Sequence, residues 1–271
     1  MRGAPRRWSF LRVDSPPFLT AAWRYLAMLN FEVPPALLRP LVPAGTELDT
    51  GAGVTLASLV GFRFLDTRVL GIAVPGHRDF DEVNLRFYVR RQAEDGAWRR
   101  AVVFVRELVP RRAIATVARW VYHEPYSAVP MRHELEVTGA TEGAPARVAY
   151  AWRLNGRWHR LEVRTYGVPL LPAPGSEAAF ITEHYWGYTR RRDGGTAEYR
   201  VAHVPWRVWP AADTSLDGDM AHVYGAGFAE CLRGPPRSAF LAEGSTVTVS
   251  GGRRIPARPR PAPGVSFSTL G

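Results

Sequence analysis

Lysine is absent from this sequence of 271 residues, and all 35 of its Lys or Arg positions are arginine. A side-chain amine is needed to form an imine with a carbonyl compound, and the arginine guanidinium stays protonated and cannot replace it. Catalysis through a lysine Schiff base is therefore excluded. The arginines occur mostly in ones and twos along the chain. Together with abundant Ala, Gly and Pro, this spread indicates a codon bias toward GC-rich triplets.

Cysteine occurs once, at Cys231. A single cysteine cannot form an intramolecular disulfide, and neither a CxxC pair nor a Cys/His cluster is present to hold zinc, which suits a reducing cytoplasm. The segment 213–224 begins like a calcium loop but has Tyr224 where a bidentate glutamate is required. No dinucleotide fingerprint, Walker loop or GxSxG motif is present. We therefore expect neither a metal ion nor a cofactor.

Long hydrophobic runs are also missing. The longest uncharged apolar stretch, residues 52–62, is far too short to span a bilayer, so we expect a cytoplasmic protein without a membrane anchor. The formal net charge of +10 leaves nucleic-acid or acidic-partner binding open as an alternative. The scattered placement of the arginines argues against a dedicated nucleic-acid surface. A homo-oligomer also stays open.

The composition is that of a globular protein, because 46% of the residues are hydrophobic and can bury the core of a single domain. We expect that domain to span 19–252, between a basic extension (1–18) and a tail rich in Pro and Arg (253–271). Near its start, the segment 21–31 is predicted to be a helix, because its apolar residues recur at spacings of three and four. Two prolines then predict a short helix over 36–41.

From residue 54 onward, short runs rich in Val, Tyr, Trp and Phe alternate with Gly, Pro or Asp turns, which is typical of a β-rich domain. Hairpin turns are predicted at 94–96 and at Asn155-Gly156. A helix is predicted over 114–122, and a helical turn beginning at Ser176. The predicted strands are residues 54–64, 68–74, 81–91, 97–108, 132–138, 146–154, 157–165, 184–191, 196–204 and 245–250. We therefore expect a β-rich α+β fold built on a closed or nearly closed barrel, which leaves few exposed strand edges.

One expected strand carries the best site candidate. Its residues Glu82, Asn84, Arg86 and Tyr88 fall on one face, since successive side chains of a strand point to opposite sides. Facing water, they would belong to an ordinary amphipathic strand; facing a barrel lumen, they would form a polar lining. Arg86 and Glu82 are about 13 Å apart along the strand, too far to pair. An inward Arg86 then needs another acid, which Glu107 offers, or an anionic ligand whose carboxylate or phosphate suits a guanidinium.

Further polar and aromatic side chains could contribute to such a pocket. Arg106 lies beside Glu107 on the partner strand, and two clusters of aromatic and acidic residues follow later in the chain. At least half of these aromatic residues are expected to belong to the core. The additional ligand-binding candidates are Arg106, Tyr122, Tyr126, Glu183 and Tyr185.

Five motifs stand out for their length and order along the chain. They are Glu82-Val83-Asn84-Leu85-Arg86-Phe87-Tyr88-Val89-Arg90, Arg106-Glu107-Leu108-Val109-Pro110-Arg111, Tyr122-His123-Glu124-Pro125-Tyr126, Phe180-Ile181-Thr182-Glu183-His184-Tyr185-Trp186-Gly187-Tyr188 and Leu241-Ala242-Glu243-Gly244-Ser245. Together they resemble the YqjF-like family of bacterial proteins, also called domain of unknown function 2071. The resemblance extends from about Trp23 to Ser250.

This resemblance implies a fold similar to that of acetoacetate decarboxylases, a β-barrel with flanking helices around a small-molecule pocket. Those enzymes depend on a catalytic lysine, and their Pro-Lys-Lys stretch corresponds to Pro110-Arg111-Arg112 in this sequence. The arginines remove the imine mechanism and keep the positive charge. Arg111 therefore joins the ligand-binding candidates.

Our expectation is a protein that binds a small anionic or carbonyl-bearing organic molecule in the barrel, with enzymatic activity left open. One alternative is an enzyme of lyase or hydrolase type that uses non-covalent acid–base catalysis, with Glu82 or Glu107 as base and Arg86 as anion stabiliser. The other is nucleic-acid or acidic-partner binding, whose affinity would fall steeply with salt.

Overall fold

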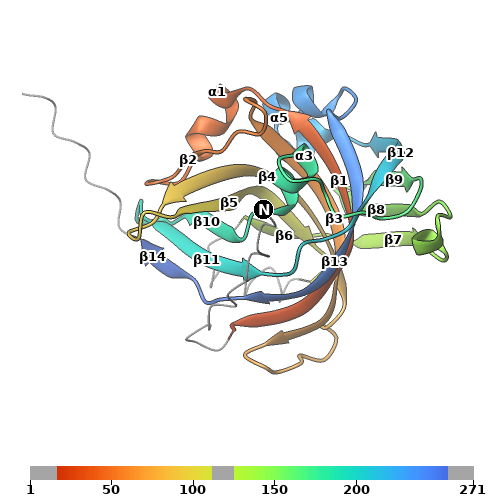
Figure 1. Cartoon of the computed structure of the whole chain (residues 1–271), viewed down its shortest axis with the longest axis horizontal. Helices are drawn as coiled ribbons and strands as arrows, with labels where there is room; N and C mark the ends of the chain where they lie inside the picture. Colours follow the sequence, from red (N-terminus) through yellow and green to blue (C-terminus); the bar gives the residue numbers. More distant parts are fainter. Residues whose placement is uncertain (1–16, 112–124, 256–271) are drawn as a thin grey trace, which may run out of the picture.

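The computed structural model describes residues 17–111 and 125–255, whose strands form one large sheet that closes partially into a barrel (Figure 1). The neighbouring strands of this barrel are, in order, β11 (Thr196–Ala202), β10 (Trp186–Arg190), β5 (Trp98–Val109), β4 (Phe80–Gln92), β3 (Leu56–Val69), β1 (Leu19–Glu32) and β13 (Ser238–Val249). They pair antiparallel except β5 and β10, which run parallel. The barrel closes where β11 meets β13 at two residue pairs, Val201 with Val249 and Ala202 with Thr248.

The same sheet continues beyond β13 and forms a second layer at the right of Figure 1. Its strands are β12 (Val208–Asp217), β9 (Arg157–Thr165), β8 (Arg147–Leu154) and β7 (Met131–Glu136). Only the first part of β12 pairs with β13, and the rest pairs with β9, so the layer turns away from the barrel at β12.

Short elements complete the described chain. The helices are α1 (Pro35–Leu38), η1 (Arg39–Leu41), η2 (Ala140–Glu142), α3 (Glu177–Thr182), α4 (Met220–Tyr224) and α5 (Ala226–Leu232), and the short strands are β2 (Glu47–Leu48), β6 (Tyr126–Ala128) and β14 (Arg253–Ile255). β14 pairs with β11, so the sheet extends to Ile255, three residues past the expected end of the domain. Within the described ranges, no helix has both the length and the apolar character needed to cross a membrane.

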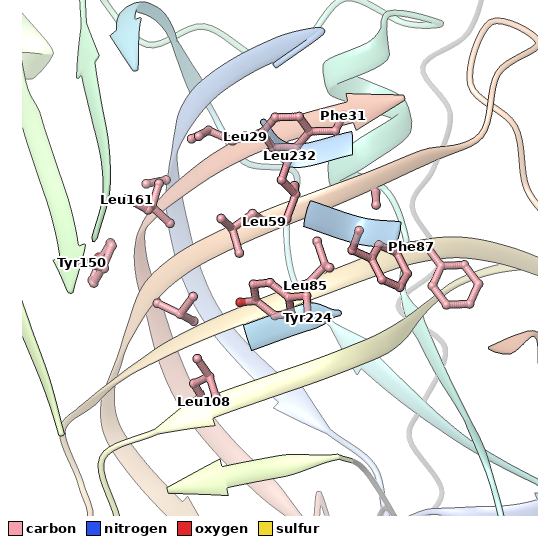
Figure 2. Close-up of a cluster of buried hydrophobic side chains, with 14 of the residues drawn as sticks. Leu29, Phe31, Leu59, Leu85, Phe87, Leu108, Tyr150, Leu161, Tyr224 and Leu232 are labelled. Carbon is pink, nitrogen blue, oxygen red and sulfur yellow. The ribbon is translucent and has the colours of Figure 1, made fainter. Parts of the chain in front are cut away.

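Two hydrophobic clusters lie on opposite faces of the barrel wall. The outer cluster joins barrel strands to the second layer and to α4 and α5. Figure 2 shows residues of this cluster, among them Leu85 and Phe87 of β4 and Tyr224 and Leu232 of the helices. The inner cluster contains residues of the same strands that point into the lumen, including Phe62, and it surrounds the site described below.

The helix predicted over 21–31 is wrong, because these residues belong to β1. Residues 26–31 are all buried, with Leu29 in the outer cluster and Met28 in the inner one. A strand buried on both faces lacks the alternation of apolar and polar residues that marks an amphipathic strand. Tyr25 adds a local irregularity, with φ 56° and a register shift against β3 between Arg24 and Ala27.

Other predictions had mixed outcomes. The short helix over 36–41 is confirmed as α1 and η1, and Ser176 caps α3 by accepting a hydrogen bond from the Ala179 amide. Both hairpin turns are confirmed, with positive φ at Asn155 and Gly156. The strand over 68–74 is wrong, since β3 ends at Val69 and a turn follows. β12, α4 and α5 were not predicted, and the helix expected over 114–122 lies outside the described residues.

Candidate functional site

The polar face of β4 points into the barrel. Glu82, Asn84 and Arg86 line the lumen and are 2%, 1% and 7% exposed, whereas the intervening Leu85 and Phe87 lie in the outer cluster (Figure 2). The polar residues are thus enclosed by protein rather than turned toward bulk water. Burial of charged and amide groups is costly unless they find partners, so their contacts decide what this site can do.

A bulge in β5 decides which residues face those of β4. Leu85 pairs with Arg106 and Arg86 pairs with Phe104, so Val105 is an extra residue on the β5 side. One extra residue in a strand turns each following side chain to the opposite face of the sheet. Glu107 therefore points into the lumen opposite Asn84, with its side chain buried.

Glu82 is held by two neighbours in the lumen. Asn84 Nδ2 donates a hydrogen bond to Glu82 Oε1 at 2.9 Å, and the Tyr126 hydroxyl of β6 donates to Glu82 Oε2 at 3.1 Å. Two donors on one carboxyl group fix its orientation. Glu82 is therefore a positioned carboxylate rather than a freely rotating one.

Arg86 supplies a positive charge that the described residues leave without an anionic partner. No ion pair joins it to a carboxylate of residues 17–111 or 125–255, and its buried Nε has no hydrogen-bond partner there. A buried guanidinium without a partner is costly. Its fork of N–H groups suits a bound carboxylate, which would remove that cost.

Three histidines also line the lumen, His77, His184 and His203. His184 Nε2 lies 3.3 Å from Asp49 Oδ2, and Arg100 Nε donates to the same oxygen at 2.8 Å. Burial lowers the pKa of His184 to about 4, and burial likewise lowers the pKa of His203 to about 4. The charge of Arg86 depresses both pKa values further. Both imidazoles are therefore neutral near pH 7 and can act as hydrogen-bonding groups without adding charge.

The cavity bounded by these residues has a volume of about 190 Å³. Aromatic side chains from segments far apart in the sequence form much of its remaining wall. They are Trp23, Phe62, Phe64, Phe80, Phe104, Trp186, Tyr199 and Trp206. A concave, mostly apolar cavity with a few converging polar groups is the usual form of a small-molecule site.

The remaining candidates from the sequence lie outside this cavity. Tyr88 is buried beneath it, with its hydroxyl 2.5 Å from Ser58 Oγ. Arg106 points outward, and its Nη1 donates to the Val223 carbonyl at 2.7 Å. Arg111 and Glu183 are exposed. Tyr185 is half-buried and packs on His203 rather than lining the cavity, with ring centroids 4.8 Å apart.

Tyr122 and Arg112 lie outside the described residues, so the structure does not place them. The sequence reasoning missed His184, His203 and the aromatic wall. His184 lies between Glu183 and Tyr185, the two residues that the sequence predicted to bind the ligand. Among the residues that the structure describes, no cluster of three or more His, Cys, Asp or Glu side chains could hold a metal ion.

Solved structures of known enzymes share this fold. Acetoacetate decarboxylase from Legionella pneumophila matches with a TM-score of 0.62 and 13% identity, over 89% of this chain and 88% of that one. The enduracididine biosynthesis enzyme MppR, complexed with pyruvate, matches with a TM-score of 0.61 and 15% identity, over 92% and 94% of the chains. An acetoacetate decarboxylase-like enzyme from Sphingomonas wittichii RW1 matches with a TM-score of 0.59 and 15% identity, over 92% and 98%. The expected decarboxylase-like barrel is confirmed.

Sequence comparison identifies a family and a relative of higher sequence identity than these enzymes. The uncharacterized protein YqjF of Bacillus subtilis is 28% identical over 187 residues, which cover 68% of this chain and 72% of YqjF. Residues 20–246 match the family DUF2071, described as an uncharacterized conserved protein. This match covers almost the whole barrel and its second layer, and the family expected from the five motifs is confirmed. The chain belongs to the DUF2071 family.

Proposed function

We propose that this protein binds a small organic molecule carrying a carboxylate or a carbonyl group in the barrel lumen, without forming a covalent imine. The observation that carries the proposal is Arg86, a buried guanidinium that faces the cavity and has no anionic partner among the described residues. An anionic ligand would supply the missing partner.

The likeness to MppR supports the same proposal. That enzyme has been solved with pyruvate, a small ketoacid, and it shares the fold of this chain at 15% identity. A protein of this fold can thus bind a small ketoacid. The absence of lysine limits the chemistry, because no side chain of this sequence can form an imine with the carbonyl.

A second candidate is non-covalent acid–base catalysis in the same lumen, and the contacts of Glu82 favour it. Tyr126 and Asn84 hold this carboxylate in place, and Glu107 lies opposite Asn84 on the neighbouring strand. In this reading Glu82 or Glu107 takes a proton from the bound molecule while Arg86 stabilises the negative charge that develops. Turnover that survives the double change Glu82→Gln and Glu107→Gln would rule out this assignment.

Isothermal titration calorimetry of the full chain tests the binding proposal. We expect pyruvate or acetoacetate to bind wild type and to lose at least tenfold in affinity in Arg86→Gln, which removes the charge but keeps a polar side chain. The matched control is Arg90→Gln, since Arg90 lies on the same strand but is exposed and pairs with Glu47. Equal binding by wild type and Arg86→Gln would contradict the proposal. Salt-sensitive binding of oligonucleotides alone would instead favour the nucleic-acid alternative.

A further inference from the structure

Five aromatic side chains form a continuous wall on one part of the lumen. The Trp23 ring lies 5.3 Å from Phe62, 5.5 Å from Phe64 and 6.3 Å from Trp206, measured between ring centroids. Phe64 stacks on Phe80 at 4.5 Å with an interplanar angle of 12°. All five residues line the cavity. The wall presents both ring faces and ring edges, which suits contact with another aromatic ring.

Arg86 lies at a different level of the cavity from most of this wall. Arg86 and Phe80 are six residues apart on β4, which corresponds to roughly 20 Å along an ideal strand. Phe64 pairs directly with Phe80, and Phe62 pairs with Glu82, so the aromatic wall gathers toward the start of β4 while Arg86 lies toward its middle. The cavity therefore has its arginine at one level and the stacked rings of Phe64 and Phe80 at another, with Glu82 and Phe62 between them.

The volume sets the size of a suitable ligand. An engineered apolar cavity of about 150 Å³ binds benzene. The lumen here, at about 190 Å³, has room for a ring and a few further atoms. A three- or four-carbon acid bound at Arg86 would leave the aromatic wall facing water or empty space, which forfeits the free energy of burying apolar surface.

We infer that the lumen selects a carboxylic acid or ketoacid that carries an aromatic ring, with its carboxylate at Arg86 and its ring against Trp23, Phe62 and Phe64. This inference rests on the proposed function and narrows its ligand class. The neutral state of His184 and His203 near pH 7 is compatible with an apolar ligand body, because neither histidine adds a charge to the cavity.

Calorimetric titration with a matched ligand series tests the inference. The probes are pyruvate, phenylpyruvate, 3-phenylpropionate and 3-phenylpropan-1-ol, each added to the full chain. We expect phenylpyruvate and 3-phenylpropionate to bind at least tenfold more tightly than pyruvate, because the ring adds buried apolar area. We expect the alcohol to bind at least tenfold more weakly than 3-phenylpropionate, because it lacks the carboxylate.

Two variants separate the contribution of the wall from general damage to the fold. Phe64→Leu removes a ring of the wall. It should lower the affinity for phenylpyruvate at least fivefold and change the affinity for pyruvate by less than twofold. Phe87→Leu is the control, since Phe87 lies on β4 but packs in the outer cluster (Figure 2). If Phe64→Leu does not fold, Trp206→Phe serves in its place.

The outcomes distinguish this inference from the proposed function. Equal affinities for pyruvate and phenylpyruvate, both lost in Arg86→Gln, would overturn the ring requirement and leave the proposed function standing. Tighter binding of phenylpyruvate that is unaffected by Phe64→Leu and Trp206→Phe would place the ring elsewhere and overturn the inference. Absence of binding by every acid would overturn both.

Discussion

Asn84 and Glu107 lie directly opposite each other on β4 and β5, and both side chains are buried in the lumen. Asn84 also donates a hydrogen bond to Glu82. A neutral amide thus lies next to two acidic residues in the lumen. We therefore expect the site to need an uncharged side chain at position 84, and a substitution that changes mainly the charge tests this.

Asn84→Asp adds a third carboxylate to this group. We expect its free energy of unfolding to be lower than that of wild type by about 2 kcal/mol at pH 7.5, because buried like charges repel. Repulsion raises the carboxylate pKa values in the folded state, so the folded protein binds protons more readily and the deficit shrinks as the pH falls to 5.5. Urea unfolding at both pH values measures this change. Asn84→Leu, which removes the same hydrogen bond to Glu82 but adds no charge, should show a deficit that depends less on pH.

His184 makes stability depend on pH. Its folded-state pKa of about 4 lies below the value of about 6.5 expected in the unfolded chain. The unfolded chain therefore takes up the proton first, and the free energy of unfolding falls as the pH drops from 6.5 to 4, by on the order of 3 kcal/mol from this residue. Denaturant unfolding across that range should show a shallower pH dependence in His184→Gln. An unchanged slope would mean that His184 is not held neutral in the fold.

Gly187 has no room for a side chain. It pairs with Tyr199 across β10 and β11, and a Cβ at this position would lie 2.1 Å from Tyr199 Cζ. Gly187→Ala must displace the Tyr199 ring, which lines the cavity. We expect a loss of about 3 kcal/mol in stability and weaker ligand binding. Gly234→Ala is the control, since a Cβ there meets nothing within 4 Å. Thermal unfolding compares the two variants.

Ser176 is the N-cap residue of α3. Its hydroxyl accepts a hydrogen bond from the Ala179 amide at 3.2 Å, and the helix carries Ile181 and Thr182 to the cavity. Ser176→Ala should lower the free energy of unfolding by about 1 kcal/mol, whereas Ser176→Asp, which can also cap the helix, should stay close to wild type. Equal losses in both variants, measured by urea unfolding, would show that the hydroxyl does not contribute as a cap.

Much of this arrangement could be predicted from local patterns. The alternation in β4 placed Glu82, Asn84 and Arg86 on one face, because this strand separates a polar lumen from an apolar outer cluster. The same logic fails where a strand is buried on both faces. In β1 the buried residues 26–31 are apolar on both sides except Asn30, so the sequence lacked the alternation that marks a strand.

Other features depend on contacts between distant segments. Arg106 and Glu107 were both predicted to contribute to the lumen, but neighbouring residues of a strand point to opposite faces. The bulge at Val105 directs Glu107 into the lumen and Arg106 outward. No local signal marks that bulge. The aromatic wall joins Trp23, Phe62 and Trp206, whose proximity follows only from the pairing of strands that are far apart in the chain.

The two-pair contact between β11 and β13 gives the barrel a narrow seam. Both Val201 and Val249 belong to this seam, and both line the cavity. A ligand that contacts both residues would bind the closed barrel in preference to one that has parted at the seam. Ligand binding would then stabilise the closed barrel, and slower amide hydrogen exchange at the seam would show that the lumen is occupied.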